Sequence, residues 1–77
     1  MPFFTIVVLL PDYIRDDYAS PVFVCTVQAP RAPEAAELAK RAAADHYSEA
    51  EGKEIDSDDF LPVAVFPGVH VAVPFED

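Results

Sequence analysis

Apolar segments alternate with polar, proline-punctuated stretches in the first thirty residues. Residues 3–10, FFTIVVLL, are rich in β-branched and aromatic side chains and end at Pro11, which predicts a first strand. Residues 11–20 carry Pro, Asp and Ser, which is typical of a connecting loop. Residues 21–29, PVFVCTVQA, predict a second strand, because proline is tolerated at the first position of a strand.

The pattern then changes to a helical period rich in alanine. Pro33 can open a helix because its missing amide hydrogen would be unsatisfied there, and Gly52 is suited to end one, so a helix is predicted over 33–50. Glu37 and Arg41 are expected to pair on its outer face. The small inner face lets the helix lie close to a sheet, and it is expected to consist of Ala35, Ala36, Leu38, Ala39, Ala42, Ala43 and Tyr47.

A third strand is predicted over 61–66, LPVAVF, and the segment VHVAV at 69–73 predicts a short additional strand after a Pro-Gly turn. The order is therefore β-β-α-β. The second and third strands, joined through the helix, are expected to form a right-handed crossover in one sheet. If the first strand, which is the most hydrophobic of the three, fills the gap between them, the sheet is antiparallel throughout. The sequence predicts one α+β domain over 1–77, with a three-stranded antiparallel sheet of order 2-1-3 and one helix on one face.

The first strand is apolar at both its even and its odd positions. A strand that is buried on both faces shows this pattern, yet a single helix can cover only one face of the sheet. The second face is therefore expected to be covered by residues 69–75 or by another molecule. A homodimer that forms through this apolar sheet face is one such arrangement.

The chain has a formal charge of −9, from fourteen acidic and five basic residues. This argues against direct binding to nucleic acid or to anionic membranes, and it suits either solubility or a basic partner. The topology predicts that the loops 11–20 and 51–60 lie at the same end of the domain, with Arg15 and Lys53 opposing the acidic side chains. The expected partner-binding residues are Asp12, Tyr13, Asp16, Asp17, Tyr18, Glu49, Glu51, Glu54, Asp56, Asp58 and Asp59.

These residues have two interpretations. The acidic loops can simply be solvated surface that keeps a small domain soluble. Alternatively, they imitate the spacing of phosphates and occupy the basic channel of a nucleic-acid-binding protein. Tyr13 and Tyr18 can contact that partner or anchor the loop on the core. No metal or other cofactor is expected, because the run at 56–59 lacks the ligand pattern of a calcium loop.

Catalysis is not expected from the isolated reactive residues. His46 and His70 have no plausible nucleophile nearby, and Cys25 in mid-strand resembles a small buried apolar residue. The segment PFFTIVV resembles the start of the tautomerase family, which implies Pro2 as a general base and leaves an enzyme as a third alternative. The N-terminal apolar segment is too short to span a bilayer and lacks a signal-peptide pattern, so a cytoplasmic location in a bacterial host cell is expected.

The segment LLPDYIRDDYASPVFVCTV, the Ala-rich helix and LPVAVFPGVH together are similar to small proteins of phages, prophages and proteobacteria. In size, acidity and standalone character the chain also resembles anti-CRISPR proteins. This resemblance implies a stoichiometric, non-catalytic inhibitor that binds a CRISPR surveillance complex, for example of type I, and blocks its path for target DNA. The alternative is a small homodimeric assembly module of a phage or bacterium, whose acidity serves solubility.

Overall fold

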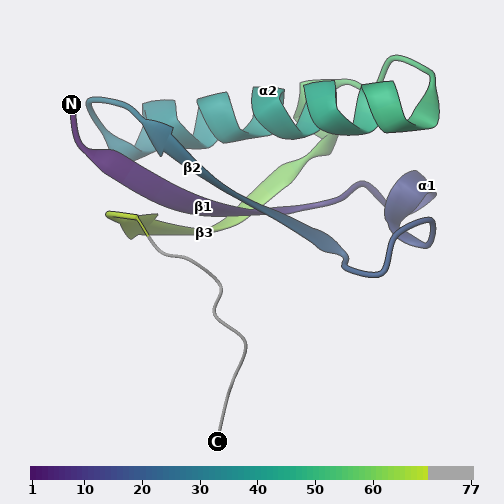
Figure 1. Ribbon diagram of the computed structural model, residues 1–77, viewed down its shortest axis with the longest axis horizontal. Coiled ribbons are helices and arrows are strands. Elements are labelled where there is room, and N and C mark those ends of the chain that lie inside the picture. Colours follow the sequence, from purple (N-terminus) through teal and green to yellow (C-terminus); the bar gives the residue numbers. More distant parts are fainter. Residues whose placement is uncertain (70–77) are drawn as a thin grey trace, which may run out of the picture.

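The computed structural model describes residues 1–69 and shows a three-stranded antiparallel sheet with one long helix across one face (Figure 1). The strand order is β2-β1-β3, so the predicted α+β class and the predicted order 2-1-3 are both confirmed. The elements are β1 Phe3–Leu9, α1 Asp12–Arg15, β2 Val22–Gln28, α2 Ala32–Glu51, the 3₁₀ turn η1 Ser57–Asp59 and β3 Leu61–Pro67.

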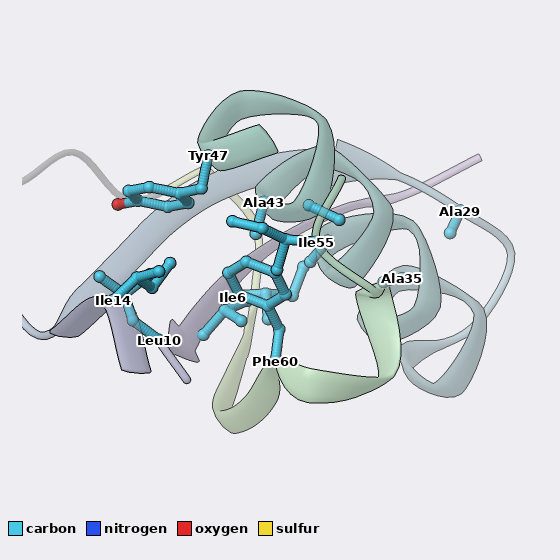
Figure 2. Close-up of a cluster of buried hydrophobic side chains, with 12 residues drawn as sticks. Ile6, Leu10, Ile14, Ala29, Ala35, Ala43, Tyr47, Ile55 and Phe60 are labelled. Carbon is cyan, nitrogen blue, oxygen red and sulfur yellow. The ribbon is translucent and has the colours of Figure 1, made fainter. Parts of the chain in front are cut away.

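The core lies between the sheet and α2. Alternate residues of β1 point to the helix, and Ile6 and Val8 are fully buried there. The helix packs mainly through alanines, whose small side chains leave the larger apolar groups of the sheet room to fill the layer. Side chains from the connecting segments complete this cluster, whose larger members outside β1 are Leu10, Ile14, Tyr47, Ile55 and Phe60 (Figure 2).

The segment 11–20 is not wholly a loop as predicted, because it contains the single helical turn α1. Pro11 precedes this turn, and the Ile14 amide donates to the Pro11 carbonyl oxygen at 3.2 Å. Burial of the Ile14 side chain in the core offsets the cost of ordering so short a turn. The loop prediction rested on the Pro and Asp residues of this segment. The helical turn depends instead on a tertiary contact, the packing of Ile14 in the core.

The buried face of α2 is rotated from the predicted one. Leu38 is 39% exposed, whereas Ala44, which was not predicted to be internal, is only 7% exposed. The cause is the segment after the helix, which turns back along α2 and covers the side that carries Ala44. The Ile55 amide donates to the Ser48 hydroxyl at 2.9 Å and fixes that return. Gly52, with φ of 69°, ends the helix in the left-handed conformation that this turn requires.

The opposite face of the sheet is largely exposed in the described part of the chain. Phe3, Val24 and Leu61 lie on it and are 47%, 48% and 58% exposed. Thr5 is an exception at 2%, since its hydroxyl bonds to the Gly68 carbonyl at 2.9 Å. The sequence prediction that one helix leaves a second apolar face is therefore confirmed for residues 1–69. The expected strand at 69–73 and the expected cover over 69–75 extend outside the described residues.

Candidate partner-binding surface

Two aromatic contacts join the acidic segments that precede β2 and β3. The Tyr13 hydroxyl donates a hydrogen bond to the Asp59 carboxylate, and the Tyr18 hydroxyl donates to the Glu51 carboxylate at 2.8 Å. The Lys53 ammonium also lies 5.8 Å from the centre of the Tyr13 ring. Segments separated by more than thirty residues of sequence thus lie side by side, which is the arrangement that the topology predicts.

The two tyrosines differ in how much of the ring remains available to a partner. Tyr18 packs against the core, with its ring edge-on to Tyr47 at a centroid distance of 4.8 Å. It therefore anchors the segment 11–20, which is one of its two expected roles. Tyr13 is 56% exposed and keeps most of its ring in solvent, although its hydroxyl is bonded.

Both phenols are stabilised in their protonated form. The hydrogen bond to Asp59 raises the pKa of Tyr13 to about 12, and the hydrogen bond to Glu51 raises the pKa of Tyr18 to about 12. An ionised phenol cannot donate a hydrogen bond to these carboxylates, and its negative charge would be repelled by theirs.

We expect this pair of contacts to weaken at alkaline pH. Each folded-state pKa lies above the unfolded value near 10, so the stabilisation is complete below pH 10 and is lost as the pH rises toward 12. Urea unfolding between pH 8 and pH 11 measures this loss. The double variant Tyr13→Phe/Tyr18→Phe is the control, and it is expected to show a smaller decline; an equal decline in both proteins contradicts the assignment.

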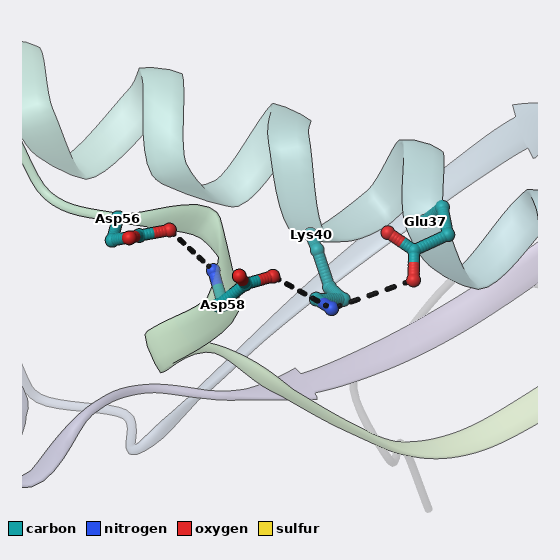
Figure 3. A network of polar contacts seen from close by, with 4 residues as sticks. All are labelled: Glu37, Lys40, Asp56 and Asp58. Atoms are coloured by element: carbon teal, nitrogen blue, oxygen red, sulfur yellow. Dashed lines mark hydrogen bonds and ion pairs between the residues drawn. The ribbon is translucent and has the colours of Figure 1, made fainter.

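Several acidic side chains of this region are already engaged within the protein. Asp12 pairs with Arg15 at 2.8 Å. Asp58 pairs with Lys40 at 3.4 Å, while Asp56 accepts a hydrogen bond from the Asp58 amide at 2.9 Å (Figure 3). These carboxylates have fixed orientations but a reduced capacity to bind an external cation.

Four other acidic side chains among the expected partner-binding residues form no hydrogen bond or ion pair with any residue between 1 and 69. All four are exposed, and they lie on both of the joined segments. These four carboxylates, together with the exposed ring of Tyr13, are called the acidic surface below. Its carboxylates belong to Asp16, Asp17, Glu49 and Glu54.

The expectation that nine carboxylates crowd one end of the domain needs a correction. Asp58 lies beside Lys40, about three helical turns before the end of α2, because the segment 51–60 runs back along the helix. Lys40 was missed as an opposing cation, and it also pairs with Glu37 at 3.5 Å. Glu37 therefore pairs with Lys40 rather than with Arg41 as predicted. No local sequence signal indicates the contact between residues 40 and 58.

The returning segment also forms an open groove with the outer side of α2. Glu49 and Glu54 line this groove together with Asp45, Arg41 and Lys53. The sequence prediction did not include Asp45 or Arg41, because the groove depends on the return of the chain. Its two cations reduce the negative potential there. On the segment 11–20 Asp12 pairs with Arg15, so the uncompensated charge of that segment lies at Asp16 and Asp17.

Other candidate chemistry is dispersed. Burial raises the pKa of the half-buried Cys25 thiol, which lowers its reactivity. His46 is exposed and lies against Phe23, with ring centroids 5.3 Å apart, whereas His70 is outside the described residues. Pro2, the base that the tautomerase alternative implies, precedes β1, whereas Arg15 follows this strand and is therefore at its far end.

Residues 1–69 carry neither a metal-binding cluster nor a membrane-spanning helix. No group of three or more His, Cys, Asp or Glu side chains in that range is arranged to hold a metal ion. No helix among the same residues has the length and apolar character needed to cross a membrane.

Comparisons with protein-family models, with curated proteins and with solved structures find no match to this chain. A functional hypothesis is therefore best judged by the geometry and charge of the acidic surface.

Proposed function

We propose that the protein is a non-catalytic inhibitor that binds a CRISPR surveillance complex through the acidic surface and blocks its binding of target DNA. The observation that carries the proposal is the acidic surface, whose four carboxylates have no internal partner among residues 1–69 and stand on two segments that Tyr13 and Tyr18 bond together. The type of partner comes from the sequence resemblance to anti-CRISPR proteins. The mode of binding is inferred from the geometry of this surface.

A basic path for nucleic acid binds phosphates mainly by charge and makes few demands on sequence. Carboxylates on a folded surface can compete for the same Lys and Arg side chains. They lose little conformational entropy on binding if their supporting segments are already fixed, which is the role given to Tyr18 and Ile14 in this fold. The exposed ring of Tyr13 adds apolar contact area beside the charges.

A comparison of two charge-matched variants tests the proposal. Asp16→Asn/Asp17→Asn removes two negative charges from the acidic surface. Glu34→Gln/Leu38→Lys changes the net charge by the same amount at the other end of α2. Since each exposed ion pair contributes about 0.2–1 kcal/mol, the first variant is expected to inhibit DNA binding by a purified type I surveillance complex about tenfold more weakly.

The Glu34→Gln/Leu38→Lys protein is expected to inhibit as the parent does, and circular dichroism checks that both variants are folded. Equal weakening of inhibition in the two variants indicates a general effect of net charge and contradicts the assigned surface. Parent protein that inhibits none of a panel of surveillance complexes contradicts the proposed function itself.

The exposed sheet face favours a second candidate function. Phe3, Val24 and Leu61 expose apolar area that the first proposal does not use. A small assembly module of a phage or bacterium would use this face for association and its acidity for solubility. Val7→Asp distinguishes the two: it is expected to abolish association through the face and leave the inhibition of DNA binding intact.

A further inference from the structure

The two edges of the sheet differ in their capacity to pair with another strand. The edge strand β3 contains Pro62 and Pro67, which lack amide hydrogens, and a register shift opposite Val7 and Val8 interrupts its pairing with β1. Prolines and bulges are features that protect an edge from pairing. Strand β2, at the other edge, has the sequence VFVCTVQ, with no charge, no proline and no register shift.

The direction of the backbone groups of β2 follows from two hydrogen bonds at its ends. The Leu10 amide donates to the Pro21 carbonyl at 2.9 Å, and the Ala29 amide donates to the Pro2 carbonyl at 3.1 Å. Because antiparallel ladders alternate, the odd-numbered residues of β2 bond to β1. The amide and carbonyl groups of the even-numbered residues then point away from the sheet, and these residues are Val22, Val24, Thr26 and Gln28. Both groups of Val22 bond to the exposed Ser20 hydroxyl, at 3.3 Å and 3.2 Å, and pairing with a second strand would replace these two contacts.

We infer that β2 pairs antiparallel with β2 of a second copy of this chain, so that two sheets form one six-stranded sheet. The strand runs from Val22 to Gln28, and its midpoint is Cys25. The register that pairs all seven residues is therefore symmetric about Cys25. In this register Val22 lies opposite Gln28 of the second copy, and Val24 lies opposite its Thr26. These are the residues whose backbone groups point outward. The register that pairs all seven residues is therefore also the register in which these groups can form hydrogen bonds with the second copy.

The arrangement leaves room for the two helices. Helix α2 lies across the sheet, whose central strand is β1, and the two β1 strands would be separated by three strand spacings, or about 14 Å. Helices that pack directly on each other need only about 8–10 Å, so this spacing leaves room for both α2 helices over the central strands.

Charge also favours the antiparallel arrangement. Asp16 and Asp17 precede the start of β2, whereas Arg31 follows its end. Antiparallel pairing places the start of one strand beside the end of the other. The two acidic surfaces are then kept apart by about the length of β2, roughly 23 Å. Arg31 already pairs with Glu34 at 2.7 Å, so the benefit is reduced repulsion between the two acidic surfaces.

The symmetric register makes Cys25 a direct probe, because it is the single cysteine of the chain. Cys25 would lie opposite Cys25 of the second copy in a non-hydrogen-bonded pair, with a Cα–Cα distance of about 4.5 Å. A disulfide spans Cα–Cα distances of about 4.4–6.8 Å. Copper-phenanthroline oxidation of the full chain is therefore expected to give a covalent dimer that a reductant reverses.

The matched control is Cys25→Ser/Val27→Cys, which moves the thiol two residues along the same face of the same strand. Its two thiols would be separated by four residues of strand, about 13 Å, and no covalent dimer is expected. Sedimentation should show that both reduced proteins remain dimeric. Val24→Pro removes an outward amide and is expected to give a monomer, whereas Val24→Thr keeps the amide and is expected to remain a dimer.

The inference is overturned if the parent protein is still monomeric at a concentration of about 100 μM. This outcome does not depend on whether the Val24→Pro protein folds. A dimer that Cys25 does not cross-link also overturns it and indicates association through another surface, such as the exposed sheet face. Equally efficient cross-linking of the Cys25→Ser/Val27→Cys protein overturns it too, because it indicates another register or collisional cross-linking. Because inhibition of DNA binding is measured separately, failure of this inference leaves the proposed function standing.

Discussion

Replacement of Phe60 by alanine is expected to lower the free energy of unfolding by about 3–5 kcal/mol, the usual cost of removing a buried aromatic side chain. Phe60 is 2% exposed and stacks on Tyr47, with ring centroids 5.9 Å apart. It lies between η1 and β3, where the chain returns from the helix to the sheet. A domain of 77 residues has a total stability of about 4–12 kcal/mol, so this loss is a large fraction of the total.

Urea unfolding monitored by circular dichroism measures this effect. Phe3→Ala is the matched control, because the same substitution is made on the sheet face where Phe3 is 47% exposed. We expect it to cost about 1 kcal/mol or less. A loss below about 1 kcal/mol for Phe60→Ala would contradict the assignment of Phe60 to the core.

Replacement of Ile14 by alanine is expected to cost about 2–5 kcal/mol and to change the acidic surface as well. Ile14 is fully buried and is the buried residue of α1, which also carries Tyr13. Loss of its side chain should release this turn and weaken the contact between Tyr13 and Asp59. Weaker inhibition of DNA binding should therefore accompany the loss of stability.

Hydrogen exchange of the Ile14 and Asp17 amides, both bonded within this turn, measures the release directly. Asp12→Ala is the control on the same turn, because Asp12 is exposed and its removal should cost less than about 1 kcal/mol. Retention of full amide protection in Ile14→Ala would show that the turn is held by other contacts.

The sheet could be predicted from sequence because its determinants are local and strong. Apolar β-branched runs mark β1, β2 and β3. The connections allow only a few strand orders, and the order with β1 in the centre is one of them. The turn α1 and the rotated face of α2 could not be predicted in the same way. Each depends on a contact between distant segments, namely burial of Ile14 in the core and the return of Ile55 to Ser48.

The same limit applies to the acidic surface. The densest acidic run, at 56–59, is the most obvious feature of the sequence, yet the structure bonds Asp56, Asp58 and Asp59 to other residues. The carboxylates without partners among residues 1–69 include Asp16 and Asp17, which stand in a less conspicuous run. Charge composition identified the region, whereas the contacts of each side chain decide which members remain available to a partner.

The most direct test of the proposed function is an equilibrium competition between this protein and target DNA for one purified type I surveillance complex. If the acidic surface occupies the DNA path, the apparent inhibition constant should rise in proportion to the DNA concentration, and the binding should weaken as salt is added. A ternary complex of the surveillance complex, the DNA and this protein would contradict the proposal, since both ligands would then bind at separate sites.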